Sequence, residues 1–566
     1  MKKLASITFV ICALLSSTFL VSTSSAAPDP TKYAWPPKYN EGRSGQPLLG
    51  YSFTLVDNFT QNNSGESFSF IRLSTGTQRF CEDFKDAACK NEVEAGGRWW
   101  SNQVIPPCID EKSLFSCIEA LNIIHEDGRL ERLTYKGLIP GNPWPEDPSI
   151  SLEAGSSSSM WISKEENNPN KGYKVTVSGG LGLSFSDKST VSRASLSSFQ
   201  ANVEPYEEIS GTFKPEQIFV SNDGRRTFSA NAPNYCIWVD FNKCGVQSEF
   251  PDNKRIQLVL HIPSDITGWL LGRLDQPLFA AKPMGISTIS KRPLSRVTLS
   301  GFPVQVPLMS VKVENANASR EMIEEVENLQ FYKDNPSQKT GYMGGYNASS
   351  YFDSAYTRFK MFEKFFDDKS NFVLPRWSVR TFRSSDPNYS RCTAGKTESI
   401  NGIVTTNASI YQGEPPEFDG EEFTYKVAGL HKLPDGNVFK GSYDLALQSD
   451  FARCLYNFSN APIKASVEVT NSDGTSNIAT TSFTEKDKWT YLSIKGFTFS
   501  QPTIKTKFVQ EKIVAQPSPT PTIAPPASPS PAAAILRKAT ITCVKGKQTK
   551  KITGFSPKCP AGYKKK

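Results

Sequence analysis

Histidine is scarce in this chain of 566 residues, which contains only His125, His261 and His431. Three imidazoles leave little material for a histidine-based zinc site or a histidine-dependent catalytic triad. The sequence also lacks Gly-x-Ser-x-Gly, Gly-x-x-x-x-Gly-Lys-Ser/Thr and His-Glu-x-x-His, the signatures of a nucleophile elbow, a phosphate-binding loop and a zinc peptidase helix. Each histidine lies beside a turn or in a strand-like run, so we expect all three to be structural.

Long apolar runs are missing after residue 21, and the one at the start has the form of an export signal. Lys2 and Lys3 precede an apolar run over residues 4–21, and the small residues Ser24, Ser25 and Ala26 follow it. This order predicts a signal peptide over residues 1–26, cleaved near Ala26. The alternative, an uncleaved anchor, is disfavoured because the run is rich in Ser and Thr and barely spans a bilayer. We expect a secreted or extracellular cell-surface protein with no transmembrane span after cleavage.

The cysteines lack the spacing of a metal site. Without Cys12, which lies in the signal peptide, ten remain, an even number typical of disulfides formed in an oxidising compartment. No Cys-x-x-Cys pair occurs, which argues against zinc. The spacing favours neighbouring pairs, with exchanges among the first four cysteines as the alternative: Cys81–Cys89, Cys108–Cys117, Cys236–Cys244, Cys392–Cys454 and Cys543–Cys559. We expect these pairs to staple the fold and not to be reactive.

Period-two alternation and Asp-Gly turns predict a mainly β protein. Asp-Gly occurs between strand-like flanks at residues 127–128, 223–224, 435–436 and 473–474, and it suits the tight turns of hairpins. Apolar side chains alternate with polar ones over residues 256–262, which places His261 on the face opposite Leu260. Further strands are expected over residues 51–56, 173–177, 297–299, 311–313, 377–382, 423–427, 465–470 and 489–494. We therefore predict several antiparallel, β-sandwich-like domains.

Two helical segments and a composition change divide the chain. Apolar stripes predict helices over residues 319–332 and 354–366, the second of which carries Phe359, Phe362 and Phe366 as expected core residues. The predicted body has an N-terminal β domain with two disulfides at 27–145, a second β domain at 146–315, a helix-containing segment at 316–375 and an Ig-like β domain at 376–514. A Pro/Ser/Thr-rich linker at 515–534 follows, which would span about 55 Å in the polyproline II conformation.

The last 32 residues contain no acidic side chain. Their formal charge is +10, the chain as a whole is +8 and the signal peptide is +2, so the segment between them is −4. Two short strands closed by Cys543–Cys559 are expected here, since so small a unit has little core of its own. The predicted polyanion-binding residues are Arg537, Lys538, Lys545, Lys547, Lys550, Lys551, Lys558, Lys564, Lys565 and Lys566. Only Phe555 and Tyr563 interrupt these cations, so specific nucleic-acid recognition is not expected.

The tail carries a resemblance to known proteins. Residues 540–547, Lys550-Lys551 and residues 557–566 resemble a Lys-rich, Cys-paired C-terminal module of secreted actinobacterial proteins, which follows Pro/Ser/Thr linkers. Residues 106–118, 268–274, 452–456 and 496–504 are similar to a family of large secreted actinobacterial proteins of unassigned function. The resemblance implies export and possible surface association, and it implies no activity or functional residue.

Carboxylates are the remaining candidates for catalysis. Glu414, Glu417, Asp419, Glu421 and Glu422 share one short segment, where a solvated turn is expected rather than two carboxylates facing across a cleft. The calcium-loop pattern is absent, and no metal, cofactor or catalytic residue is predicted. Trp99-Trp100 is a candidate sugar platform, although one ring of an adjacent pair in a strand must face the core.

These observations favour an exported, non-enzymatic protein that associates with the cell envelope through its cationic tail and presents β domains for binding. Its expected partners are anionic envelope polymers or polysaccharide. One alternative is a secreted polysaccharide-acting hydrolase, which requires two converging carboxylates. Another is a self-assembling structural surface protein.

Overall fold

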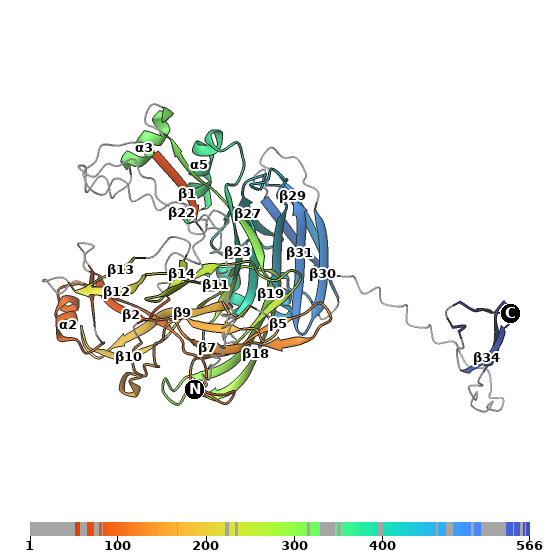
Figure 1. The fold of residues 1–566 in the computed structure, drawn as a ribbon, viewed down its shortest axis with the longest axis horizontal. Helices are drawn as coiled ribbons and strands as arrows, with labels where there is room; N and C mark the ends of the chain where they lie inside the picture. The colour runs from red at the N-terminus through yellow and green to blue at the C-terminus, as the bar shows by residue number, and fades with distance from the viewer. Residues whose placement is uncertain are drawn as a thin grey trace, which may run out of the picture. The chain divides into compact units, whose positions relative to one another are not determined.

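We analysed a computed structural model of the chain. It describes residues 51–56, 65–72, 78–81, 83–141, 143–166, 168–220, 226–231, 236–313, 317–328, 346–347, 352–393, 400–459, 462–470, 479–499, 503–510, 539–546, 548–554, 558–560 and 562–565. The predicted signal peptide and linker lie outside these residues, as do Arg537, Lys538, Lys547 and Lys566. The chain forms two compact units, residues 1–511 and 512–566 (Figure 1).

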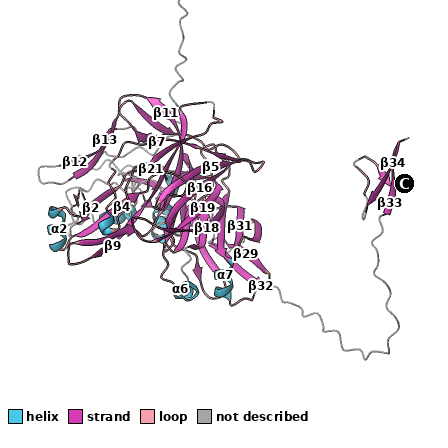
Figure 2. Ribbon diagram, turned by 90° about the horizontal axis from the view of Figure 1, so that it is seen from below, coloured by secondary structure: helices cyan, strands magenta, loops and turns pink. Residues whose placement is uncertain are grey.

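Strands dominate the first unit, as predicted, and few helices accompany them (Figure 2). A continuous path of paired strands runs β3-β2-β4-β9-β11-β23-β17-β24-β28-β31-β30. Only the β17–β24 pairing in this path is parallel. The bounds are β2 Phe68–Arg72, β3 Gln78–Phe80, β4 Arg98–Val104, β9 Lys171–Phe185, β11 Gln200–Ser210, β17 Gly268–Arg273, β23 Phe372–Phe382, β24 Ile400–Thr406, β28 Gly441–Gln448, β30 Thr480–Lys486 and β31 Trp489–Phe497.

Shorter strands branch from this path. The branches are β7 Thr134–Leu138, β8 Ser159–Ile162, β10 Val191–Leu196, β14 Cys236–Val239, β15 Lys243–Gln247 and β20 Val304–Leu308. β1 Tyr51–Val56 pairs with β21 Ser310–Val313 and β22 Tyr346–Asn347, and β12 Lys214–Val220 pairs with β13 Arg226–Asn231. The helices are α2 Ala87–Glu94, α3 Arg320–Asn328, α5 Phe352–Phe362, α6 Pro387–Thr393 and α7 Ser449–Tyr456, with 3-10 turns η1 Pro148–Ile150 and η4 Glu363–Phe365.

Two further sheets cover the strand path. One has the order β18-β19-β16-β5-β6, and the other has the order β25-β27-β32-β29, with β26 beside β27. Their bounds are β5 Cys117–Ile124, β6 Leu130–Arg132, β16 Arg255–Pro263, β18 Asp275–Ile286, β19 Pro293–Phe302, β25 Ile410–Tyr411, β26 Glu417–Phe418, β27 Phe423–Ala428, β29 Ile463–Thr470 and β32 Thr503–Gln510.

The main core lies between the strand path and the β18-β19-β16-β5-β6 sheet. Val203 on β11 and Trp377 on β23 share one buried cluster with Leu260 on β16 and Leu299 on β19. A second cluster joins β28 and β31 to the sheet that contains β27. Because β24 and β28 contribute to both clusters, they are buried on both faces, which explains why their sequences lack simple alternation.

The strands of the four expected body segments pair with one another. β4 from segment 27–145 pairs with β9 from segment 146–315, and β11 from that second segment pairs with β23. β23 itself crosses the expected boundary at residue 375. Sheets therefore run across the expected boundaries, and residues 1–511 are one compact unit.

Most expected elements are present, and several differ in extent. All eight further strands, and the one over 256–262, have counterparts in the structure. The strand expected to begin at Trp377 begins earlier, at Phe372. It continues through Pro375, which lies opposite Gln305 of β20. The expected helix over 354–366 is divided into α5 and the 3-10 turn η4, with Phe359 and Phe362 in the core. α3 covers the described part of the other expected helix.

The second unit is a small three-stranded sheet. β33 (Ala539–Lys545) pairs with β34 (Gln548–Gly554) and with β35 (Lys564–Lys565). The third strand was not expected from the sequence. Cys543 and Cys559 form the disulfide of this unit, and the other four disulfides join the neighbouring pairs that the spacing favours.

Candidate functional site

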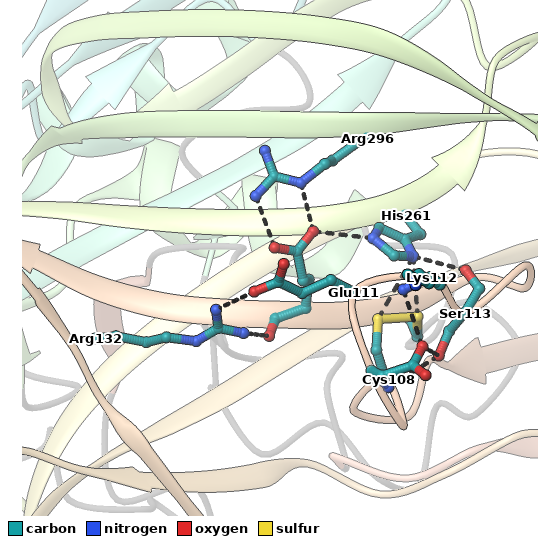
Figure 3. A network of polar contacts seen from close by, with 10 residues as sticks. Cys108, Glu111, Lys112, Ser113, Arg132, His261 and Arg296 are labelled. Carbon is teal, nitrogen blue, oxygen red and sulfur yellow. Dashed lines mark hydrogen bonds and ion pairs between the residues drawn. A yellow bond between two sulfur atoms is a disulfide. The ribbon is translucent and has the colours of Figure 1, made fainter.

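A charged row crosses three adjacent strands of the β18-β19-β16-β5-β6 sheet. His261 on β16 lies directly opposite Arg296 on β19 and opposite Cys117 on β5. Residues opposite each other on paired strands share one face, so these three side chains form a row (Figure 3). The row lies on the face away from the main core, as the alternation around His261 predicts.

Glu119 enters this row through a break in strand register. Val259 pairs with Ala120 whereas Leu260 pairs with Ile118, so Glu119 is the extra residue of a β-bulge in β5. Bulges change the direction of a side chain relative to the regular strand. The carboxylate of Glu119 consequently lies within hydrogen-bond distance of both His261 and Arg296, which are labelled in Figure 3.

The polar contacts in the row are short. Arg296 donates from Nε to Glu119 Oε2 at 2.5 Å and from Nη2 to Oε1 at 2.6 Å, a bidentate pair. His261 Nε2 lies 3.0 Å from Glu119 Oε2, and Nδ1 lies 2.9 Å from the carbonyl oxygen of Ser113. Burial of Glu119 opposes its ionisation, but the hydrogen bonds from Arg296 and His261 outweigh burial and hold the pKa of Glu119 below its usual value.

The contacts of His261 suit an imidazolium. Both ring nitrogens face an acceptor, a carboxylate on one side and a carbonyl on the other. A neutral imidazole carries one N–H, so only the doubly protonated imidazolium donates to both. The His261 side chain is fully buried, and the Glu119 carboxylate is the counter-charge within hydrogen-bond distance.

The Cys108–Cys117 disulfide covers His261. Nδ1 of His261 lies 3.5 Å from the sulfur of Cys117 and 3.7 Å from that of Cys108 (Figure 3). Cys117 is buried, whereas Cys108 is half-buried at the start of a loop whose next residue, Ile109, is 88% exposed. This loop explains why a side chain on the outer face of β16 is inaccessible to solvent.

Buried hydrogen bonds hold the loop in place. The backbone N–H of Ser116 donates to Glu153 Oε2 at 2.9 Å, and the hydroxyls of Ser287 and Ser290 donate to Oε1 of the same carboxylate at 2.5 and 2.8 Å. Thr288 donates its backbone N–H to the carbonyl of Leu114 at 3.0 Å. The loop is thus fixed to the connection between β18 and β19.

A second buried charged cluster lies between β18 and β28. Asp444 on β28 accepts at Oδ2 from the backbone N–H of Gln276 at 3.0 Å and from the hydroxyl of Thr405 at 3.3 Å. Burial first, and the negative charge of Asp275 second, raise the pKa of Asp444 to about 7. Asp275 itself binds Lys495 Nζ at 2.5 Å through Oδ2. Two carboxylates therefore converge here, but Asp444 is only 2% exposed, which leaves no accessible pair of the kind that glycoside hydrolysis needs.

His125 belongs to a closed network of hydrogen bonds. Its Nε2 lies 3.2 Å from Glu131 Oε2, and its Nδ1 lies 3.2 Å from Nη2 of Arg129. Arg129 also binds both oxygens of Glu165. His125, Glu131 and Glu165 have ligand atoms close enough for a metal ion, but the guanidinium already supplies the positive charge. His431, the remaining histidine, forms an ion pair with Asp368.

The acidic segment around Asp419 forms a turn in which most carboxylates are exposed, as the sequence predicts. Asp419 accepts the backbone N–H groups of Glu421 and Glu422 in a turn, and these two glutamates form ion pairs with Lys507 and Lys505.

Of the two rings in β4, Trp99 packs against Phe84, whereas Trp100 is 51% exposed. The Trp100 ring stacks on Phe70 at 5.7 Å, and the Arg72 guanidinium lies 6.0 Å from its centroid. Trp100 is thus the more accessible ring of the predicted sugar platform, since Trp99 is half-buried.

The tail unit displays its cations on both faces of the small sheet. Cys543 lies opposite Lys550 on β34 and Lys565 on β35, whereas Val544 lies opposite Lys564. Lys550 Nζ lies 5.4 Å from the ring centroid of Tyr563, whose hydroxyl donates to Gln548 Oε1 at 3.0 Å. Six predicted polyanion-binding residues are described, and all are exposed: Lys545, Lys550, Lys551, Lys558, Lys564 and Lys565.

The buried acids Glu119 and Asp444 and the half-buried Asp275 were not expected from the sequence. A signal was present in two of them, since Glu119 interrupts an apolar strand and Asp444 lies between Tyr443 and Leu445. A charge within a buried strand requires a partner. The identity of that partner depends on strand pairing, which the sequence did not provide.

No family model matches the chain, and comparison with the curated proteins finds no match either. The structure defines a class only: a mainly β protein with five disulfides among its described residues and a separate cationic unit at its C-terminal end. Among the described residues, no helix has both the length and the apolar character to cross a membrane.

Proposed function

We propose that this chain is an exported, non-enzymatic protein that binds anionic polymers of the cell envelope through its tail unit, residues 535–566, and presents the β body for binding. The observation that carries the proposal is the charge of that unit, ten cations with no acidic residue. A cationic surface of this density attracts polyanions over a distance set by ionic strength.

The geometry of the tail supports binding to an extended polymer. Lys550 and Lys565 flank Cys543 on one face, and Lys551 and Lys564 lie on the other, so cations surround the sheet. The disulfide between Cys543 and Cys559 closes the unit, which reduces the entropy lost when several charges bind one chain. Because the positive charge is spread evenly over both faces, the unit should attract many polyanions and should not recognise one particular sequence or sugar.

The proposal that the chain is exported rests on the first 26 residues and on the cysteines. The predicted signal peptide leads to an oxidising compartment, where ten paired cysteines are stable. The resemblance to secreted actinobacterial proteins agrees with this location, and we include surface association of that group in the proposal.

Cell fractionation tests the proposal. Cells would make the full chain, a version that ends at Ala534, and a full chain in which Lys550, Lys551, Lys564 and Lys565 are glutamine. The full chain should remain with the envelope in dilute salt and be released at about 1 M salt, where the Debye length falls to about 3 Å. The truncated chain should appear in the medium, and the glutamine variant should be released at lower salt than the full chain. Equal retention of all three forms, or no retention of the full chain, would show that the tail is not the tether.

A further inference from the structure

The surroundings of the Cys108–Cys117 disulfide differ from those of a disulfide that only staples a fold. From these surroundings we propose that Cys108–Cys117 is a thiol–disulfide exchange site, with Cys108 as the sulfur that an external thiol attacks and His261 as the group that stabilises the departing Cys117 thiolate. This inference is independent of the tail, because it uses only side chains of residues 108–296.

The two sulfurs differ in access. Cys108 is half-buried at the edge of the sheet, and the loop residues 109–112 that follow it are exposed. Cys117 is fully buried on β5. An incoming thiolate therefore reaches Cys108 first, and Cys117 is the leaving group. Access and the pKa of the leaving thiol both govern the rate of exchange.

The leaving sulfur has a cation beside it. Nδ1 of His261 is 3.5 Å from Cys117 Sγ, and both ring nitrogens face acceptors, which fits the imidazolium. A neighbouring positive charge lowers the pKa of a thiol and stabilises the thiolate. Stabilising the reduced form makes a disulfide more oxidising, so its reduction begins at a lower proportion of external thiol.

Glu119 and Arg296 position His261. The carboxylate of Glu119 fixes the ring through Nε2, and the bidentate contact from Arg296 fixes that carboxylate. Arg296, whose side chain is 40% exposed, also balances the negative charge of Glu119, which leaves the buried His261 as the cationic group next to the disulfide. A positive field at the disulfide is what a departing thiolate requires.

The exchange needs a two-electron reductant, and we assign a dithiol to that role. One thiolate of the dithiol bonds to Cys108 Sγ, the Cys108–Cys117 bond breaks, and its electron pair moves onto Cys117 Sγ as a thiolate. The second thiolate of the reagent then attacks its own sulfur in the mixed disulfide, which releases the Cys108 thiolate and the oxidised, cyclic reagent. The protein gains two electrons and the dithiol loses two.

The chain contains a matched control. Cys236 and Cys244 are eight residues apart, against nine for Cys108 and Cys117, and they likewise combine a half-buried with a buried cysteine. Their surroundings differ, because this disulfide packs in an apolar cluster with Phe213 and Val246. The charged row therefore predicts a difference between the two disulfides in the same molecule, and the His261 variant described below assigns that difference.

The test is a redox titration of the full chain in mixtures of reduced and oxidised dithiothreitol. Free thiols are trapped with an alkylating reagent at equilibrium, and peptide mass analysis gives the reduced fraction of each pair. We expect the Cys108–Cys117 equilibrium to favour reduction at least tenfold more than Cys236–Cys244, which corresponds to about 30 mV. Equal midpoints, or later reduction of Cys108–Cys117, would overturn the proposal.

A variant assigns the effect to the imidazolium. His261→Gln keeps a hydrogen-bonding side chain but removes the charge, so it should make Cys108–Cys117 several-fold harder to reduce and leave Cys236–Cys244 unchanged. An unchanged Cys108–Cys117 midpoint in the folded variant would refute the role of His261. The order of reduction is measured in the unmodified protein, so the proposal stays testable even if this variant does not fold.

Discussion

Replacing Asp444 by asparagine should remove a large part of the pH dependence of stability. Asp444 is buried beneath Gln276, and its carboxyl holds a proton up to about pH 7 because burial and the charge of Asp275 oppose ionisation. Asparagine has the same shape and retains an acceptor for the Gln276 N–H, but it does not titrate. The variant therefore separates the contribution of the titrating proton to stability from that of side-chain packing.

The sign and size of the effect follow from the difference between the folded and unfolded states. In the unfolded chain the pKa of this carboxyl is near 3.8, so the folded state binds the proton more tightly. The contribution of the protonated form to stability is fully present below about pH 3.8 and is lost as pH rises through 7. Three pKa units correspond to about 4 kcal/mol, since one unit is about 1.4 kcal/mol. The wild-type chain should lose up to this amount between pH 4 and pH 8.

Unfolding monitored by tryptophan fluorescence at a series of pH values measures this loss. The stability of Asp444→Asn relative to wild type should rise steadily from pH 4 to pH 8 and then level off. Asp435→Asn is the control, because Asp435 is exposed in a turn, and its curve should run parallel to that of wild type. Parallel curves for wild type and Asp444→Asn would show that Asp444 does not hold its proton in the folded state.

Two further substitutions test packing and buried charge by the same unfolding measurement. Gly402→Ala should destabilise by about 1–3 kcal/mol, because a methyl group there overlaps the buried Trp269 ring, whereas Gly180→Ala, with its closest neighbour at 3.7 Å, should be far milder. Equal losses of stability in the two variants would contradict the close approach of the Trp269 ring to Gly402. Glu119→Ala should cost about 3–5 kcal/mol, since it leaves the His261 charge buried without its partner. A loss under 1 kcal/mol would mean that this carboxylate pairs weakly.

The sequence was most informative where a property is local. Alternation assigned His261 to the outer face of its strand, and this is correct. Spacing favoured the disulfide between Cys108 and Cys117, because two cysteines that flank a short loop are close in almost any fold. Neither signal showed that the loop folds back over the histidine, since that contact joins residues 144 positions apart.

Long-range pairing was the part that the sequence could not supply. β11 pairs with β23 across about 175 residues, and β17 pairs in parallel with β24 across about 130. Such contacts depend on the whole arrangement of sheets, and no local pattern encodes them. Glu119 shows the consequence for a site, because a single-residue bulge in β5 decides whether its carboxylate reaches His261.

Stability alone does not account for the charged row beneath Cys108–Cys117. A buried ion pair loses much of its hydration, and apolar residues of similar volume are often as stabilising or more so. The same chain closes another loop of nearly the same length with Cys236–Cys244, which packs in an apolar cluster with Phe213 and Val246. A staple can therefore be built in this protein without buried charge. The imidazolium of His261 contributes something that Phe213 and Val246 cannot, a positive charge close enough to act on a sulfur. This charge stabilises the reduced state of the disulfide, in which Cys117 is a thiolate.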